Sequence, residues 1–260
     1  MMRTSYSGTQ SVVRAIRLLK LFGGSQAIWS LTEIVEAAGL NKTTVFRMLT
    51  ALESEGLLER AENGSYKLGT EMVALGGRAL HTNSLRQLAQ PVLEELVALT
   101  GERTTLEVPV TNPDGTLAML MMAEIQGKHL ISINQYVGSR LPIHATSTGK
   151  ALLAFMSDEE RDIVLQQQLT PLTRRTIVNR ANLMKELALI RERGYAVAMG
   201  ELEIGLMAAG TPVYNYEGQP TATISIEGPL SRIDEDRLHA LGQELMRSAE
   251  IISHRLGYRK

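Results

Sequence analysis

The chain has 260 residues, of which 44% are hydrophobic and 21% charged, with a formal net charge of −1. These values exclude a disordered tail protein, and the balanced charge does not by itself indicate a nucleic-acid partner. The chain has no cysteine, which excludes disulfides, thiolate metal sites and a cysteine nucleophile. Three basic residues interrupt the apolar segment 12–22, so it predicts neither a signal peptide nor a membrane span. We expect a cytoplasmic protein of one or two domains.

The first predicted helix runs from near the N-terminus to about Phe22. Ser11 is placed to cap it, because a serine hydroxyl can accept a hydrogen bond from the first turn. Val12, Ile16 and Leu19 recur at helical spacing and are expected to face a small core.

Capping signals delimit the next two helices. Residues 30–33 (SLTE) have the pattern of a capping box and open a helix that ends at Gly39. Asn41 is placed to cap a helix from about Lys42 to Glu55, which Gly56 ends. Two helices joined by a glycine-containing turn predict a helix-turn-helix.

The second of these helices has two different faces. One face is apolar, while Thr43, Arg47 and Thr50 cluster on the opposite face. Short side chains allow close approach to base edges, and arginine can form two hydrogen bonds with guanine, so this face suits the major groove of DNA. A face of this kind also fits a merely solvated helix.

A β-hairpin is predicted after this helix. The segments 57–60 and 65–68 flank Asn63-Gly64, which is a strong turn signal. The hairpin would form a wing that carries Arg60 and Lys67.

The remaining pattern predicts two connecting helices and then a second domain. The connecting helices cover about 70–81 and a segment from Ser84 in which Pro91 either causes a kink or starts a new helix. Strands are expected at 104–110, 117–124, 130–136, 195–199, 207–214 and 220–227, and helices at 148–155, 158–167, 183–193 and 234–255. This order predicts an α+β domain with a largely antiparallel sheet.

Several motifs in the same order resemble the IclR family of bacterial transcriptional regulators. The segments LTEIV (31–35), GLNKTTV (39–45), RML (47–49), LESEGL (52–57) and YKLG (66–69) resemble its DNA-binding module. The segments LPIHA (141–145), GKALLA (149–154), LTPLT (169–173), IRERGYA (190–196) and EGP (227–229) resemble its effector domain.

The resemblance implies an α+β protein with three parts. These are a winged helix-turn-helix in residues 1–69, a linker helix region in residues 70–90 that forms dimers, and a GAF-like effector-binding domain in residues 91–260. The implied partners are a second copy or three further copies of the chain, a pseudo-palindromic double-stranded DNA operator and a small-molecule effector, with no membrane partner. Organic acids and aromatic catabolites are the usual effectors of the family.

The resemblance also implies the residues of two sites. The implied DNA-binding residues are Thr32, Lys42, Thr43, Thr44, Arg47, Thr50, Arg60 and Lys67. The implied effector-binding residues are Arg140, His144, Thr146, Ser147, Thr148, Glu201, Ala208, Ser225 and Glu227. Small residues and backbone N–H groups at a helix start suit a carboxylate.

Three of the effector-site positions leave alternatives open. Many members of the family carry cysteine at the position of Ala208, and some carry serine at the position of Glu227. A buried Glu227 next to an anionic ligand is costly unless it is protonated or paired with a cation, so a small dianionic acid does not fit if Glu227 faces the pocket. The alternative is that Glu227 points away, into solvent or onto the closing helix. Arg140 and His144 either contact the ligand or hold the loop in place.

Two other functions fit parts of the sequence. Ser147 and Lys150 match the Ser-x-x-Lys pattern of penicillin-recognising enzymes, but the companion motifs are absent. The alternatives are thus an enzyme that uses these two residues, or a ligand-binding module whose winged helix contacts proteins. The five histidines form no ligand pair, and we expect no catalytic residues, no metal and no cofactor.

Overall fold

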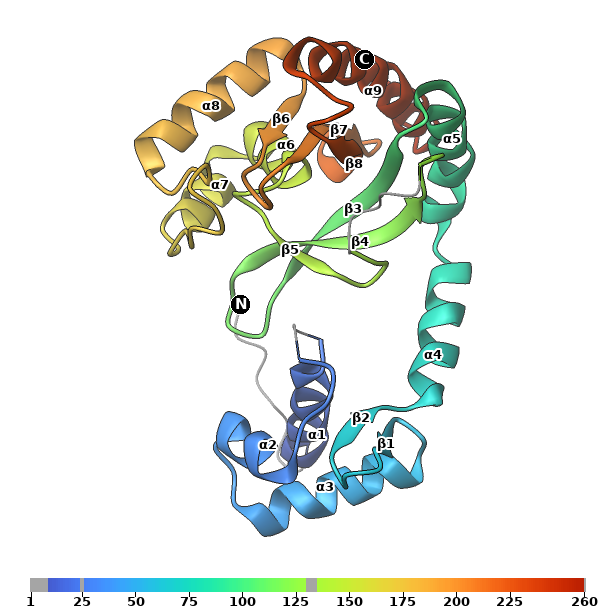
Figure 1. The fold of residues 1–260 in the computed structure, drawn as a ribbon, viewed down its shortest axis with the longest axis vertical. Helices are drawn as coiled ribbons and strands as arrows, with labels where there is room; N and C mark the ends of the chain where they lie inside the picture. The colour runs from blue at the N-terminus through green and yellow to red at the C-terminus, as the bar shows by residue number, and fades with distance from the viewer. Residues whose placement is uncertain (1–8, 24–25, 130–134, 260) are drawn as a thin grey trace. The chain divides into compact units, whose positions relative to one another are not determined.

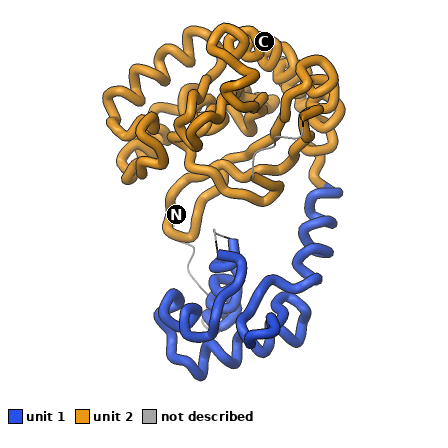
Figure 2. The backbone as a smooth tube through the Cα atoms, in the orientation of Figure 1, with its two compact units in different colours: residues 1–82 blue, residues 83–260 orange. Residues whose placement is uncertain are grey.

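The computed structural model describes residues 9–23, 26–129 and 135–259. The chain divides into two compact units, residues 1–82 and residues 83–260 (Figure 2). Within the described residues, no helix is both long and apolar enough to cross a membrane.

The first unit contains four helices and a two-stranded sheet in its described residues. They are α1 (Gln10–Leu21), α2 (Leu31–Ala38), α3 (Lys42–Ser54), β1 (Leu58–Arg60), β2 (Tyr66–Leu68) and α4 (Thr70–His81) (Figure 1). A core that includes Leu18, Ile34, Val45, Leu49 and Tyr66 joins α1 to α3 and the hairpin. The predicted helix-turn-helix and hairpin are therefore confirmed.

Local capping explains where α2 and α3 begin and end. Ser30 and Glu33 form the predicted capping box, with the Ser30 N–H donating to the Glu33 carboxylate over 2.7 Å. Gly39 ends α2 at φ 61°, a conformation that costs other residues more. The Asn41 side chain accepts a hydrogen bond of 2.8 Å from the Thr44 N–H and so caps α3.

The prediction for α1 is wrong in two respects. Ser11 lies inside the helix, whose N-cap residue Thr9 forms no side-chain cap. Of the three residues expected to face the core, Val12 and Ile16 are 58% and 47% exposed, whereas Leu19 packs partly buried against it beside the buried Leu18. The helix has more than one apolar stripe, and the stripe with Leu18 is the one that packs against the rest of the unit. The sequence pattern of the helix alone does not show which stripe is buried.

The hairpin has the predicted turn. Strands β1 and β2 pair in antiparallel register with Arg60 opposite Tyr66. Gly64 has φ 79°, which the turn requires.

The second unit is built on one antiparallel sheet. Its described elements are α5 (Ser84–Thr100), β3 (Arg103–Thr111), β4 (Leu117–Ile125), β5 (Arg140–Pro142), α6 (Ser147–Phe155), α7 (Asp158–Leu165), α8 (Arg180–Arg193), β6 (Ala196–Met199), β7 (Leu206–Tyr214), β8 (Pro220–Pro229) and α9 (Glu235–Arg255). The strand order is β5-β4-β3-β8-β7-β6, and all neighbouring pairs are antiparallel. The predicted α+β class with a largely antiparallel sheet is confirmed.

Three features of this unit bear on the expected elements. Pro91 lies inside α5, which runs as one helix from Ser84 to Thr100, so of the two alternatives a new helix at Pro91 is excluded. Residues 130–134 of the expected strand 130–136 lie outside the described residues, and residues 135 and 136 belong to no strand. The sequence analysis missed the short strand β5.

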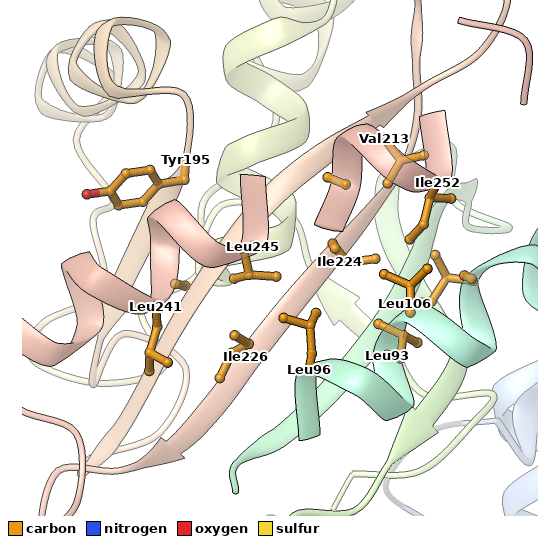
Figure 3. Packing of buried hydrophobic residues seen from close by; sticks show 14 of the residues in the cluster. Leu93, Leu96, Leu106, Tyr195, Val213, Ile224, Ile226, Leu241, Leu245 and Ile252 are labelled. Atoms are coloured by element: carbon orange, nitrogen blue, oxygen red, sulfur yellow. The ribbon is translucent and has the colours of Figure 1, made fainter. Parts of the chain in front are cut away.

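Helices cover both faces of the sheet. One face packs against α5 and α9, and its apolar cluster includes Leu93, Leu96, Leu106, Ile224, Ile226, Leu241, Leu245 and Ile252 (Figure 3). The other face lies under α6, whose apolar residues belong to a second cluster together with residues of α7 and α8.

A glycine in β7 lets α6 approach this second face closely. A Cβ atom at Gly210 would lie 2.7 Å from the Ser147 carbonyl carbon and 2.8 Å from the Thr148 nitrogen. Real Cβ atoms almost never come this near to backbone atoms, so the start of α6 can rest on the sheet only above a glycine.

Replacing this glycine tests the packing. We expect Gly210→Ala to lower the free energy of unfolding of the second unit by about 1–3 kcal/mol, because the added methyl group must displace backbone atoms. The control is Gly76→Ala in α4, where a Cβ meets nothing within 4 Å, and which should stabilise its helix by about 0.5–1 kcal/mol. Differential scanning calorimetry measures both, and an unchanged transition in Gly210→Ala would contradict the packing argument.

Candidate functional site

Helix α3 presents a polar face to solvent. Thr43, Arg47 and Thr50 are exposed on it, while Val45 and Leu49 are fully buried on the opposite face. Of the other expected DNA-binding residues, Lys42 and Thr32 are exposed and Thr44 is half-buried. Neither Lys42 nor Arg47 forms an ion pair with a residue that the structure describes, so both charges can meet an external anion.

The two basic residues of the wing are held by carboxylates. The Arg60 Nε lies 3.1 Å from the Glu53 carboxylate of α3, and its guanidinium lies 5.1 Å from the centre of the Tyr66 ring. The Lys67 ammonium lies 3.4 Å from the Glu59 carboxylate. The Arg60 pair joins the wing to α3, the Lys67 pair lies within the hairpin, and each leaves its cation partly neutralised toward an outside partner.

The sequence analysis missed Phe46 on the same helix. This ring is 44% exposed and lies, by helical periodicity, on the margin of the polar face beside Thr50. An apolar side chain there suits the methyl group of thymine. The available signal was a large aromatic residue outside the buried stripe of α3.

A second polar region lies inside the other unit, on the sheet face under α6. Along β3 and β8 successive side chains alternate between the two faces. Leu106, Ile224 and Ile226 face α5 and α9 together with Thr104, whose hydroxyl donates to the Leu93 carbonyl, while polar side chains face α6. Three polar pairs stand directly opposite one another across the two strands. The pairs are Arg103 with Glu227, Thr105 with Ser225, and Glu107 with Thr223.

An arginine holds the carboxylate that the sequence analysis left undecided. Arg103 is buried and donates from Nη1 to Glu227 Oε2 over 2.7 Å and from Nε to Glu124 over 2.7 Å. The Ser225 hydroxyl donates to the other oxygen of Glu227 over 2.8 Å. Burial raises the pKa of the Glu227 carboxyl, and the Arg103 guanidinium acts against this rise.

Hydrogen bonds connect Glu227 to a second buried carboxyl, Glu107. The chain runs from Glu107 to the Thr105 hydroxyl (3.2 Å), from there to Ser225 (2.7 Å), and on to Glu227 (2.8 Å). The two hydroxyls have only two hydrogens for these three contacts. Satisfying all three at once therefore requires one carboxyl to be protonated.

Glu107 is the carboxyl suited to hold that proton. It is fully buried, and its pKa is raised to about 7 by burial and by the neighbouring charge of Glu227. Hydrogen bonds from Thr148 and Thr105 lower the pKa but do not compensate. The Thr148 hydroxyl donates to Glu107 over 2.6 Å, which ties the first turn of α6 to the sheet.

The start of α6 closes this polar region. Thr146 caps the helix, with its hydroxyl accepting a hydrogen bond of 3.0 Å from the Gly149 N–H. The first N–H groups of a helix have no acceptor within it and carry a partial positive charge, which favours an anion.

A small cavity lies between α6, the sheet and the loop after β6. Its lining consists of Leu141, Ala145, Thr146, Ser147, Ala198, Glu201, Leu202, Leu206, Ala208 and Glu227. The space has about the size of one water molecule. Glu201 Oε1 accepts a hydrogen bond from the buried Lys150 ammonium, whereas Glu201 Oε2 is buried without a hydrogen-bond partner among the described residues.

Five of the nine expected effector residues line this cavity. They are Thr146, Ser147, Glu201, Ala208 and Glu227. Thr148 and Ser225 belong to the hydrogen-bond network behind it. The sequence analysis missed Arg103, Thr105 and Glu107, for which the alternation of polar residues along 103–107 was the available signal.

The last two expected effector residues lie outside the lining. The His144 ring contacts the Thr170 carbonyl oxygen over 3.0 Å and so joins two loops. Arg140 is exposed on β5 and donates to the Asn112 side chain over 2.8 Å. The alternatives for these two residues were contact with the ligand or a role in holding the loop. The contacts in the structure are of the second kind, because they join loops and an edge strand.

The Ser-x-x-Lys pair does not have the geometry of a catalytic pair. Lys150 is buried, and its ammonium lies 2.5 Å from Glu201 and 3.9 Å from Glu186. The Lys150 nitrogen is thus directed at two carboxylates, and among the described residues no hydrogen bond joins it to Ser147. Within the described residues, no group of three or more His, Asp or Glu side chains is arranged to hold a metal ion.

Two family models match the chain. The model described as Bacterial transcriptional regulator IclR C-terminal matches residues 77–254, and the IclR helix-turn-helix domain matches residues 11–62. The chain belongs to the IclR family. It is thus a DNA-binding transcriptional regulator with a C-terminal effector-binding domain, and the family matches are to regulators and not to enzymes.

Relatives and solved structures of this family align over nearly the whole chain. HTH-type transcriptional regulator XynR of Escherichia coli strain K12 is 34% identical over 251 residues, which are 96% of this chain and 98% of XynR. The crystal structure of an IclR transcriptional regulator from Alicyclobacillus acidocaldarius has a TM-score of 0.83 at 28% identity and covers 95% of this chain and 98% of that one. An IclR homolog from Microbacterium hydrocarbonoxydans, complexed with 4-hydroxybenzoate, has a TM-score of 0.77 at 28% identity, with coverage of 95% and 99%.

The buried Glu107 should make the stability of this IclR-family protein depend on pH. Its folded pKa of about 7 lies above the ordinary 4.5, so its contribution is full below about pH 4.5 and is lost as the pH rises through 7. Glu107→Gln cannot ionise, and its amide replaces the protonated carboxyl. We expect the difference in unfolding free energy between the variant and the parent protein to shift by about 3 kcal/mol in favour of the variant from pH 5 to pH 8.

Urea denaturation at several pH values measures this difference. Glu203→Gln is the matched control, because Glu203 is exposed and should leave the pH profile unchanged. Parallel profiles for the parent protein and Glu107→Gln would show that Glu107 has an ordinary pKa.

Proposed function

We propose that this IclR-family regulator binds a pseudo-palindromic operator as a homodimer or homotetramer and acts in the cytoplasm as a repressor, an activator or both. A small organic acid or aromatic catabolite would bind the cavity at the start of α6 and change operator affinity. An effector can do so only by binding more tightly to one arrangement of the protein than to another.

The observation that carries the DNA-binding part is the exposed face of α3. Thr43, Arg47 and Thr50 are exposed on it above a packed core, and Arg47 forms no ion pair with any of the described residues. In a helix-turn-helix protein the second helix enters the major groove, and a twofold dimer places two such helices on half-sites about one turn of DNA apart.

Exposed apolar residues on α4 support self-association. This helix has no buried residue, and Val73 is 76% exposed while Leu75 is 46% exposed. A helix with large apolar side chains and no buried face is typical of an interaction surface. The exposed Val12 and Ile16 of α1 belong to the same unit.

The cavity supports the effector part. It combines the positive end of α6 with polar side chains in an otherwise apolar wall. Because the space holds only about one water molecule, an effector would bind there by favouring an arrangement in which the cavity is wider. The homolog complexed with 4-hydroxybenzoate is a regulator of the same fold that binds an organic acid. A ligand-binding module that contacts proteins through its winged helix would bind the acid and ignore DNA.

The first test of this proposal is DNA binding by the full chain. We expect fluorescence anisotropy with fragments flanking its own gene to show one specific fragment, bound less tightly as salt increases. Thr43→Ala combined with Arg47→Ala should weaken binding about 10- to 100-fold, because a bidentate arginine–base contact contributes about 1–3 kcal/mol. Arg174→Ala, at an exposed position of the second unit, is the control. Equal affinity of the double variant and the parent protein would remove α3 from the interface.

A second test addresses the oligomer. We expect Val73→Asp to weaken self-association at least about 10-fold, because a carboxylate would be buried at an apolar contact. Sedimentation equilibrium measures the dissociation constant, with Leu230→Asp in the second unit as the control for an exposed leucine. If Val73→Asp self-associates as tightly as the parent protein, α4 is not the contact surface.

A further inference from the structure

We propose that the second unit has a further small-molecule site, a cavity between α9 and the edge of β7, and that this site binds an uncharged aromatic compound. The cavity has a volume of about 480 Å³. Among the described residues, it has no lining residue in common with the cavity at the start of α6. Small-molecule sites commonly have volumes of about 300–1,000 Å³. The proposal goes beyond the effector function and does not depend on it.

The cavity lies where β7 has lost its neighbouring strand. Strand β6 pairs only with the first half of β7, so residues 211–214 have no described strand on that side. Pro212 lines the cavity there, and a proline has no N–H. Alternate N–H groups of a strand point to the same side, so the next donor along this edge belongs to Tyr214. This N–H already donates to the Ser253 hydroxyl of α9 over 2.9 Å. The edge therefore has no free N–H at these positions for an added peptide strand, which favours a small molecule.

Aromatic rings and a methionine form much of the lining. The Phe155 ring, at the end of α6, lies with its centre 6.3 Å from that of Tyr214 and at 87° to it. The Tyr214 ring stacks on that of Tyr258, with 5.2 Å between the centres. Met246 of α9 also lines the cavity and is 38% exposed. Aromatic rings attract other rings, and a methionine side chain adapts to their shape, so a flat aromatic ring is the occupant that fits this lining.

The lining has charged side chains only among its exposed residues. Arg247 and Glu250 of α9 are exposed and opposite in sign, and the other described lining residues are uncharged. Burial and the neighbouring Tyr258 raise the pKa of Tyr214 to about 12, so its hydroxyl stays protonated at neutral pH. A charged ligand would lose hydration without meeting an opposite charge in the buried part of the cavity. An uncharged polar group can instead bond to the exposed Gln243, whose amide has donors and an acceptor.

Methionine methyl NMR shows where a ligand binds. The probes are phenol and indole, titrated into the full chain with isotope-labelled methionine methyl groups. We expect saturable shifts of the Met246 signal, because a bound aromatic ring changes the magnetic field at a methyl group beside it. The Met119 signal should not move, since Met119 lies opposite Leu141, which lines the cavity at the start of α6. Met246→Leu and Met119→Leu assign the two signals by their disappearance.

Matched probes test the ligand class. Cyclohexanol has about the size of phenol but no aromatic ring, and we expect it to bind about 3- to 10-fold more weakly. Benzoate and benzylammonium keep the ring and add a negative or a positive charge. Both should need at least about 10-fold higher concentrations to shift the Met246 signal, because their charge must be desolvated.

Two variants test the lining. Tyr258→Ala removes a ring close to the end of the chain and should weaken phenol binding at least about 3-fold. Gln243→Trp places a large side chain into the cavity from an exposed helical position and should abolish binding. Tyr216→Ala is the matched control, because Tyr216 is 73% exposed and is not part of the lining, and it should leave the affinity unchanged.

Any other outcome overturns the proposal. Shifts of Met119 without shifts of Met246 would place the probes in the cavity at the start of α6, and an absence of shifts would show that no probe binds. Equal binding of the charged probes would contradict the uncharged ligand class. Unchanged affinity in both variants would remove this cavity as the site. If Tyr258→Ala weakens self-association in sedimentation equilibrium, the face is a contact between copies of the chain. Operator binding is measured separately, and its failure would concern only the proposed function.

Discussion

The second unit depends on the pairing of charges across β3 and β8. Arg103 lies between Glu227 and Glu124 in the interior, and the sheet register places it directly opposite Glu227. Removing one partner of a buried ion pair leaves an uncompensated charge, which costs about 3–5 kcal/mol. The polar face under α6 can therefore stay buried only while these side chains remain paired.

The same face is joined to the start of α6. Gly210 lets the helix rest on the sheet, and the Thr148 hydroxyl bonds the helix to Glu107. Glu107 is connected through Thr105 and Ser225 to Glu227, which lines the cavity. An unbroken series of hydrogen bonds therefore connects Glu227 to the first turn of α6.

Local signals carried most of the sequence prediction. The capping box at Ser30, the cap at Asn41 and the turn at Gly64 depend on neighbouring residues, and these elements were predicted correctly. The face of α1 was not, because the choice between its apolar stripes is made by residues distant in sequence. Arg103 escaped detection for the same reason, since its partner Glu227 lies on another strand and only the register brings them together.

The wing shows how far a charge count can mislead. Arg60 and Lys67 are both cations on the hairpin, yet each is already engaged by a carboxylate of the first unit. A count of basic residues in the sequence would treat them like Lys42 and Arg47. A cation that is already paired with a carboxylate neutralises a DNA phosphate less fully, so it releases fewer counterions on binding.

The register of Arg103 and Glu227 also bears on how this regulator can diverge. A substitution of Arg103 alone strands the carboxylates of both Glu227 and Glu124 in the interior, whereas loss of the Glu227 carboxylate leaves Arg103 paired with Glu124. Position 103 is therefore expected to stay basic along a lineage for as long as positions 124 and 227 are acidic. New effector specificities in the cavity at the start of α6 would then arise more readily by replacement of Glu227 than of Arg103.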